Sequence, residues 1–302
     1  MEISSDLVGQ TCLPLDVAIE PRMIMNFASA VDDGNPVYLD DERKGGLIAP
    51  PMMTAALTWR ISAEFDRHWG GLGIPAAVLE RRVHACEEIE WRRVIGQGDR
   101  LRIDGEIKAV VPHRSGTSLV TQYVLRDAGG DVVAIERSTA MLRGVRCSGP
   151  GVGGEFELSR SESDRTDQSS PTWTGHIQLD ALAAHRYDAG ANIHFPIHTS
   201  PAYAHRVGLP FIIMQGTASL AVAMREIVDR NLAGNPVRIQ AVRCNFSDVM
   251  RPGTRISLSI FDDRGSIEEP GEVRFVVRNH EGSTAIRNAA VVVSEDGKVA
   301  DE

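Results

Sequence analysis

The strongest constraint on the fold of this chain is an internal repeat, because the order of elements in its first half recurs in the second. Each half carries a turn sequence, then a short loop with glycine and proline, then a strongly apolar run. These segments are residues 33–38, 45–51 and 52–61 in the first half and residues 192–198, 208–216 and 218–228 in the second. A repeat on this scale predicts two similar structural units in one chain.

Each apolar run is followed by segments in which β-branched and polar residues alternate, with turn residues between them. They are residues 100–111, 118–126 and 132–142 in the first half and 255–261, 272–279 and 284–293 in the second. Such alternation predicts antiparallel strands joined by hairpins. The run at 218–228 is apolar nearly all round, which is typical of a helix buried inside a sheet. We therefore predict an α+β fold in which each half wraps a curled antiparallel sheet around a central helix.

A polar segment separates the two halves. Between residues 159 and 171, Ser, Asp, Arg and Glu replace nearly all apolar residues, and several glycines precede this stretch. A segment without an apolar face has nothing to pack against a core, so it is typical of a linker. We predict an N-terminal domain at 1–148, a linker at 149–171 and a C-terminal domain at 172–302, each domain long enough for a compact core.

Composition narrows the classes of function. Of the 302 residues, 42% are hydrophobic and 24% charged, as in ordinary globular proteins, and the net charge is −9. This negative field repels a phosphate backbone, so we expect no nucleic-acid partner. No apolar run is long enough to span a membrane and the first residues lack a basic signal, so we expect no membrane partner and a cytoplasmic location. The four widely spaced cysteines are expected to be buried, reduced thiols.

The second half also carries short motifs in a fixed order. They are Tyr187, Asn192, Pro-Ile-His at 196–198, Pro-Ala-Tyr-Ala at 201–204, Val-Gly-Leu-Pro at 207–210 and Gln-Gly at 215–216. With them this half resembles the MaoC-like (R)-specific enoyl-CoA hydratases and 3-hydroxyacyl dehydratases of hot-dog fold. The first half, with DGNPVYLDD at 33–41 and GGLIAPP at 45–51, resembles the N-terminal hot dog of two-hot-dog members and of fatty-acid-synthase dehydratases. The resemblance implies two tandem hot-dog domains over nearly the whole chain apart from the linker.

The resemblance also implies a reaction: reversible hydration of a 2-enoyl thioester to a 3-hydroxyacyl thioester, without a cofactor. In the family an Asp and a His activate a water that adds to the β-carbon. A backbone N–H at the start of the central helix hydrogen-bonds the thioester oxygen as enolate charge develops, helped by the helix dipole. His198 falls on the family's histidine, and Gly216 falls on the glycine whose N–H faces the thioester.

One position departs from the family pattern. Five residues before His198, where the family has aspartate, stands Ile193, which can neither accept a proton nor orient water. His194 and Asn192 are the nearest polar substitutes; an imidazole titrates near neutrality, whereas an amide can only orient water, so His194 is the preferred second catalytic group. Gln215 replaces the family's second histidine but keeps a side chain that can hydrogen-bond. The spacing of His194 and His198 does not indicate zinc, because Pro196 between them is incompatible with a helix.

The first half lacks a complete site. Asp33 occupies the aspartate position, but Tyr38 stands in place of the histidine, and Pro51 has no N–H to offer where the helix begins. Because Asp-Gly-Asn-Pro is also a plain turn sequence, Asp33 is expected to cap a turn. We therefore expect this half to be a scaffold that supplies one wall of the acyl pocket.

The expected partner is an acyl-CoA or an acyl-carrier thioester. Its phosphates would need cations near the pocket mouth, and arginine suits bidentate phosphate contacts. Arg238 and Arg243 are candidates for substrate binding, together with Gln215; further arginines near the same strands are Arg81, Arg82, Arg92, Arg93 and Arg251. We expect no metal. The sequence is compatible with either a homodimer or a monomer. The alternatives are a hot-dog acyl-CoA thioesterase and a non-catalytic protein that binds acyl thioesters.

Overall fold

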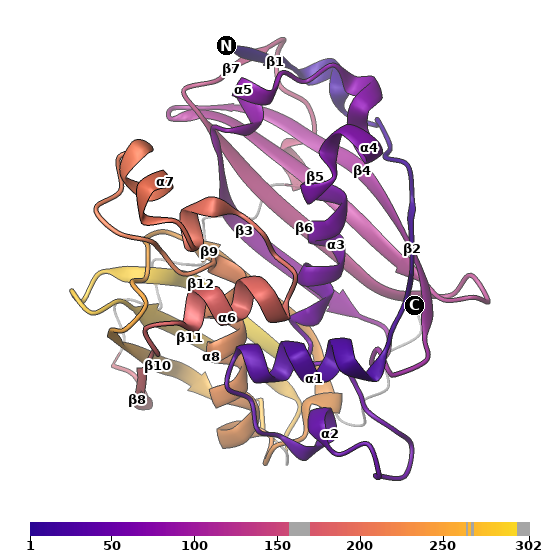
Figure 1. Ribbon diagram of the computed structural model, residues 1–302, viewed down its shortest axis with the longest axis vertical. Coiled ribbons are helices and arrows are strands. Elements are labelled where there is room, and N and C mark those ends of the chain that lie inside the picture. Colours follow the sequence, from indigo (N-terminus) through magenta and orange to yellow (C-terminus); the bar gives the residue numbers. More distant parts are fainter. Residues whose placement is uncertain (157–169, 264, 267–268, 295–302) are drawn as a thin grey trace.

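The computed structural model describes residues 1–156, 170–263, 265–266 and 269–294. Ten strands form one continuous antiparallel sheet, five from each half of the chain (Figure 1). In spatial order they are β2 (Leu15–Ala18), β4 (Arg100–His113), β5 (Gly116–Arg126), β6 (Val132–Arg143), β3 (Arg82–Trp91), β9 (Ile239–Phe246), β12 (Thr284–Val293), β11 (Gly271–Arg278), β10 (Arg255–Asp263) and β8 (Trp173–Gln178). The two halves therefore share one sheet and do not form two separate bodies.

The helices gather against this sheet, and two of them are central. They are α1 (Pro21–Ala30), α2 (Pro36–Leu39), α3 (Met53–Ala63), α4 (Phe65–Trp69), α5 (Ala76–Leu79), α6 (Ala183–Gly190), α7 (Pro201–Arg206) and α8 (Gly216–Asn231). Six consecutive residues, 53–58, and Ile61 are buried on α3, and α8 is buried on almost every side over its first three turns. The expected central helices and the α+β class are confirmed: a helix with apolar residues all round is stable only when protein surrounds it.

The join between the halves is the antiparallel pair of β3 and β9. Its register places Glu87 opposite Cys244 and Ile89 opposite Val242. Ile89, Val242 and Cys244 have no exposed surface, so the middle of the shared sheet is also the middle of the molecule. The six strands expected from alternation are present, whereas β2, β3, β8 and β9 were not expected; β3 and β9 complete the middle of the sheet, and β2 and β8 form its two edges.

The pairing of α1 with α6 joins the halves a second time (Figure 1). Phe27 of α1 meets Tyr187 of α6 edge-on, with ring centroids 5.7 Å apart, and both side chains are buried. An edge-to-face pair of buried aromatic rings adds to the stability gained from burial alone. Both joins fix the second half of the chain relative to the first.

The predicted linker at 149–171 lies partly outside the described residues. Its described start is packed: Val152 bridges Val110 of β4, and a 3₁₀ turn at Gly154–Phe156 follows. Nearby, β1 (Glu2–Ser4) and β7 (Arg146–Ser148) form a short parallel pair. All four cysteines are buried and free of disulfides, as expected. No helix within the described ranges is long and apolar enough to cross a membrane.

Candidate functional site

His198 lies at the end of a 3₁₀ turn, Pro196–His198, between α6 and α7. Its ring is fastened to the chain: Nδ1 lies 2.8 Å from the carbonyl oxygen of Ile213. A carbonyl can only accept, so Nδ1 carries the proton and Nε2 presents a lone pair. Ile213 is three residues before Gly216, so this contact holds the imidazole against the segment that leads into α8.

The start of α8 presents a backbone donor. Gly216 is the first helical residue, and the first N–H groups of a helix have no partner within it. A Cβ at Gly216 would lie 3.1 Å from the ring of Phe246, so glycine lets the aromatic ring cover the helix start closely. Gln215, just before the helix, is buried and donates from Nε2 to the carbonyl of Ala184 at 3.1 Å. The helix dipole adds positive potential at this N-terminus.

Burial sets the protonation state of His198. It lowers the pKa of this imidazole to about 4, against opposing contributions from the Ile213 hydrogen bond and the Asp188 carboxylate. At neutral pH the ring is therefore uncharged, and its Nε2 can accept a proton or a hydrogen bond. A neutral imidazole held by the segment that leads into a helix N-terminus is suited to general-base chemistry on a carbonyl compound.

In the turn that precedes His198, the side chain of His194 contacts residues of its own turn. His194 is exposed, and both its ring nitrogens lie near neighbouring side chains: Nδ1 is 2.7 Å from Asp188 Oδ2 and Nε2 is 2.8 Å from Asn192 Oδ1. Asn192 has φ +54°, the left-handed conformation that asparagine tolerates. Ile193 is buried, so its apolar side chain packs into the core at the position expected for aspartate. The roles of His194 and Asn192 in catalysis therefore remain predictions, and no contact among the described residues places them beside His198.

The first half contributes one side of this region through aromatic contacts. The ring of Phe195, next to the His198 turn, lies 6.1 Å from the His198 ring and 6.4 Å from Trp59 of α3. The guanidinium of Arg82, on β3, lies over Trp59 at 5.3 Å. These contacts bring Trp59 and Phe195 together across the two halves; that the first half supplies a wall of an acyl pocket stays a prediction.

The corresponding motif of the first half has become structural. Asp33 accepts a hydrogen bond from the N–H of Asn35 at 3.0 Å, which confirms the expected turn-capping role. Tyr38 is 1% exposed, in the place where a catalytic histidine would need access. Beside them lies a polar cavity of about 570 Å³, lined by residues 32–36 and by the end of α8 with Arg225, Glu226 and Asp229.

The arginines expected to bind phosphates are held by protein groups. Arg238 is buried and donates to the carbonyls of Ser294 at 2.8 Å and Ser266 at 3.1 Å. Arg243 forms an ion pair with Glu272 on β11. Both guanidinium groups thus have protein partners, and their role in substrate binding stays a prediction.

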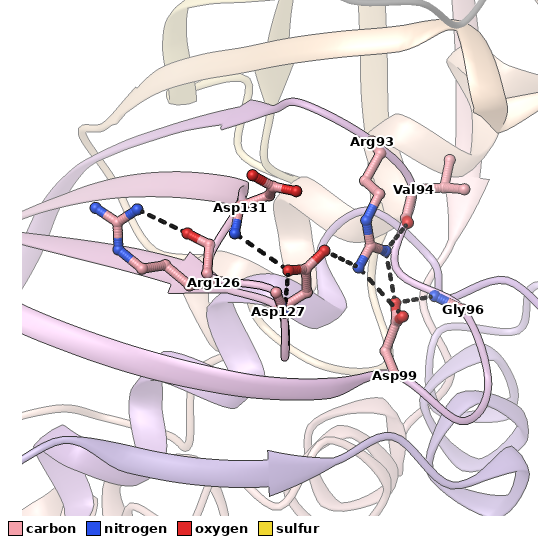
Figure 2. Close-up of polar contacts among 9 residues, drawn as sticks. Arg93, Val94, Gly96, Asp99, Arg126, Asp127 and Asp131 are labelled. Atoms are coloured by element: carbon pink, nitrogen blue, oxygen red, sulfur yellow. Dashed lines mark hydrogen bonds and ion pairs between the residues drawn. The ribbon is translucent and has the colours of Figure 1, made fainter.

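Arg93 is also held by protein groups, in a cluster of ion pairs shown in Figure 2. Its guanidinium lies 2.8 Å from Asp99 and 3.3 Å from Asp127. Burial opposes the charge of Arg93, but the two carboxylates outweigh it and raise its pKa. The cluster ties the loop after β3 to the hairpin between β5 and β6. Arg93 is therefore another structural cation.

Three polar residues near the centre of the molecule were missed as candidates: His84 and Glu87 on β3, and Glu136 on β6. Glu87 and Glu136 are buried, and His84 Nε2 lies 2.9 Å from Glu87 Oε2. Glu87 and Glu136 are acidic residues at strand positions that face the core. Periodicity alone assigns charged strand residues to the solvent face, so it does not single them out. No group of three or more His, Cys, Asp or Glu side chains that could hold a metal occurs in the described part of the chain.

Two family models match the chain in the same order as the two halves. Residues 6–136 match the FAS1-like dehydratase domain region, and residues 178–280 match the MaoC like domain. Together the two matches cover both central helices and the 3₁₀ turn of His198. The division of the matches agrees with the internal repeat.

Individual relatives match less than half of this chain. The chain is 30% identical over 148 residues to a protein of Streptomyces avermitilis named only UPF0336 protein, a match that covers 46% of this chain and 96% of that protein. It is 29% identical over 133 residues to a "probable enoyl-CoA hydratase alpha subunit" of Thermomonospora curvata, covering 38% of this chain and 42% of that one. The crystal structure of a MaoC-like dehydratase from Phytophthora capsici superposes over 97% of this chain and 98% of its own, with a TM-score of 0.79 and 19% identity.

Proposed function

The chain belongs to the MaoC-like dehydratase family with a double hot-dog fold, and from this membership we propose that it catalyses reversible addition of water to a 2-enoyl thioester. The product is a 3-hydroxyacyl thioester, and the acyl carrier is CoA or a carrier protein. The reaction is a hydro-lyase reaction and needs no redox cofactor.

One observation supports the proposal most directly. The neutral imidazole of His198 is hydrogen-bonded to the carbonyl of Ile213, three residues before the glycine that begins α8. The contact between His198 Nδ1 and the Ile213 carbonyl leaves Nε2 as the acceptor. The N–H of Gly216 lies at the positive end of α8 and has no partner within the helix. These are the two groups that hydration of an enoyl thioester requires, a base for water and a donor for the enolate oxygen.

The proposed roles follow from this geometry. Nε2 of His198 accepts a proton from water as the water oxygen bonds to the β-carbon. The Gly216 N–H donates to the thioester oxygen, which gains negative charge in the same step. The proton then passes from the imidazolium to the α-carbon, so the imidazole returns to its neutral form and one water has been added across the double bond.

The test is the loss of ultraviolet absorbance of enoyl-CoA esters, from crotonyl-CoA to longer and branched chains, with a free-thiol assay alongside. We expect absorbance to fall without thiol release in the wild type. Appearance of free thiol would instead identify a thioesterase. Binding of the esters without either change would identify a protein that binds acyl thioesters without turnover.

A further inference from the structure

A buried acidic pair lies behind a partly exposed histidine at the join of the two halves. Glu87 on β3 has no exposed surface, and Glu136 on β6 is 3% exposed. Thr58 of the central helix α3 holds Glu136, with Oγ1 at 2.9 and 2.8 Å from its two carboxyl oxygens. His84 Nε2 lies 2.9 Å from Glu87 Oε2. A buried carboxyl pair of this kind is costly unless its contacts offset the loss of water.

A β-bulge brings His84 and Glu87 to the same side of β3. In a regular strand, residues three apart point to opposite faces. The register of β3 against β6 shifts between His84 and Cys86, so one extra residue is accommodated there. Bulges of this type re-aim side chains and are frequent beside functional sites. Here the bulge directs the imidazole of His84 toward the carboxyl group of Glu87.

The contacts of His84 fix which of its ring nitrogens is free. Nε2 lies 3.0 Å from the carbonyl oxygen of Cys86, and a carbonyl can only accept. Nε2 therefore carries the proton, pointed toward Glu87 and Cys86, and Nδ1 keeps its lone pair. The His84 side chain is 31% exposed, whereas that of Glu87 behind it is 1% exposed. The ring is thus held from the inside and open on its other side.

His84 lies in the same region as the two groups of the proposed site. Its ring centroid is 4.8 Å from that of Phe246, the ring that covers Gly216 at the start of α8. Two residues earlier on β3, Arg82 lies over Trp59, which contacts Phe195 beside His198. Two independent chains of contacts therefore lead from β3, one to the backbone donor and one to the base.

We propose that His84, oriented by Glu87 and Glu136, is the second side chain that holds the reacting water, in place of the aspartate that Ile193 replaces. The inference rests on the proposed hydration reaction and adds a residue of the first half to its site. His84 is the catalytic residue in this arrangement, because it contacts the water. Glu87 and Glu136 are positioning residues, because they act through the imidazole.

In the step that follows, the water donates one hydrogen to His198 Nε2 and hydrogen-bonds with the other to His84 Nδ1. One O–H bond breaks toward His198 while the C–O bond forms at the β-carbon and the double-bond electrons move to the thioester oxygen. The proton on His198 then bonds to the α-carbon as the enolate collapses. His84 keeps its protonation state throughout, so atoms and charge balance with one water consumed.

The charges around His84 suit an acceptor. Burial lowers the pKa of its imidazole to about 4, opposed by the Glu136 charge and the Cys86 carbonyl and reinforced by Arg82. Burial also raises the pKa of Glu87 and of Glu136 well above the ordinary range. Repulsion between two adjacent carboxylates disfavours the charged form and adds to the rise in the pKa of Glu136. The neutral imidazole faces Glu87 from its own strand, Glu136 and Ser138 from β6, and Phe246 from β9.

The test compares steady-state hydration of crotonyl-CoA by the wild type and by His84→Ala, Glu87→Gln and His198→Ala, with His113→Ala as control. His113 lies at the exposed tip of the hairpin between β4 and β5. We expect His84→Ala to lower kcat by about 10²-fold, the usual scale for a positioned acid–base group, with KM changed less than about threefold. Glu87→Gln is expected to lower kcat by about tenfold, because it loosens the ring but keeps the volume. His113→Ala should match the wild type.

Added imidazole provides a readout that a structural role would not move. Because the His84 side chain is partly exposed, free imidazole can enter the space left in His84→Ala, and we expect it to restore part of kcat but nothing in His198→Ala. Circular dichroism and a thermal melt check the fold of each variant. If His84→Ala does not fold, His84→Gln takes its place under the same kcat criterion.

The outcomes separate this inference from the proposed function. A wild type that hydrates crotonyl-CoA, with activity lost in His198→Ala but kept within about threefold in folded His84 variants, would overturn the role of His84 and leave the hydratase standing. A wild type that hydrates none of the enoyl thioesters overturns both. A loss of kcat in His84→Ala that imidazole rescues supports the inference.

Discussion

At the scale of single residues, the site depends on two imidazoles that the fold keeps neutral. His198 and His84 each donate from one ring nitrogen to a backbone carbonyl, at 2.8 and 3.0 Å, and each leaves the other nitrogen as an acceptor. One comes from each half of the chain. The contact partners thus decide both the tautomer and the direction in which the free lone pair points.

Removal of the His198 imidazole is expected to lower kcat/KM for enoyl-CoA hydration by about 10²- to 10⁴-fold, the range for loss of a general base. His198→Ala should still bind the CoA ester, because the rest of the site is intact. Isothermal titration and the absorbance assay measure the two effects separately. His176→Ala on the edge strand β8 is the matched control, and an equal loss in that variant would argue against a specific role.

The pH dependence of activity follows from the direction of the pKa shift. Burial lowers the pKa of His198 to about 4, so the neutral, proton-accepting form persists far below neutrality. We expect kcat/KM to stay level from about pH 8 to about pH 5 and to fall below that, as the imidazole takes up a proton. A fall already near pH 6.5, the ordinary value for histidine, would show that the site exposes His198 to water.

For the exposed His194, in contrast to His198, we expect substitution to leave the activity nearly unchanged. Its ring nitrogens lie 2.7 Å from Asp188 and 2.8 Å from Asn192, within its own turn. If His84 holds the water, His194→Ala should keep kcat within about threefold of wild type, since it lies outside the reacting groups. A loss of about 10²-fold in that variant, comparable to His198→Ala, would favour His194 as the second catalytic group instead.

At the scale of elements, α3 is more than a core helix. Its Thr58 hydroxyl contacts both oxygens of Glu136, and its Ser62 hydroxyl lies 3.1 Å from the hydroxyl of Tyr123 on β5. Its Trp59 reaches across to Phe195 in the second half. The central helix of the first half therefore contacts both the buried acidic pair and the segment next to His198.

Removal of one hydroxyl tests this support. Thr58→Val keeps the shape of the side chain but leaves the buried Glu136 carboxyl without that partner. We expect the free energy of unfolding to fall by about 1–3 kcal/mol, the cost of an unsatisfied buried polar group. Urea denaturation measures it, with Thr121→Val on β5 as control. An unchanged midpoint in Thr58→Val would mean that the contact contributes nothing to stability.

At the scale of the whole molecule, the two halves share a sheet. If either half were removed, the other would have a long unpaired strand edge, at β3 or at β9. β3 pairs with β9 through Cys86–Glu90, and Ile89, Val242 and Cys244 are fully buried at the join. An exposed strand edge of this length is a template for pairing with another chain. The predicted domain division at 148 and 172 stays a prediction, and the shared sheet means that each half would expose an edge without the other.

Expression of the predicted N-terminal domain by itself tests whether the edge of β3 needs the second half. Residues 1–148 expressed alone would expose the edge of β3, so we expect the fragment to self-associate through that edge. Size-exclusion chromatography with light scattering measures its mass against the full chain. A monomeric fragment with the circular dichroism of a folded sheet would show instead that the first half is an independent domain.

The sequence by itself determined the repeat, both central helices, six of the strands and the turn that carries His198. These rest on local patterns: an apolar run all round a helix, alternation along a strand, and proline and glycine at turns. Only the tertiary structure decided the use of β3, where Glu87 is buried because His84 and Glu136 contact it from a bulge and a neighbouring strand. Periodicity assigns a charged strand residue to solvent, since the partners that offset its burial are distant in sequence. For the same reason only the tertiary structure showed that Arg238 contacts Ser266 and Ser294 and that Arg243 pairs with Glu272.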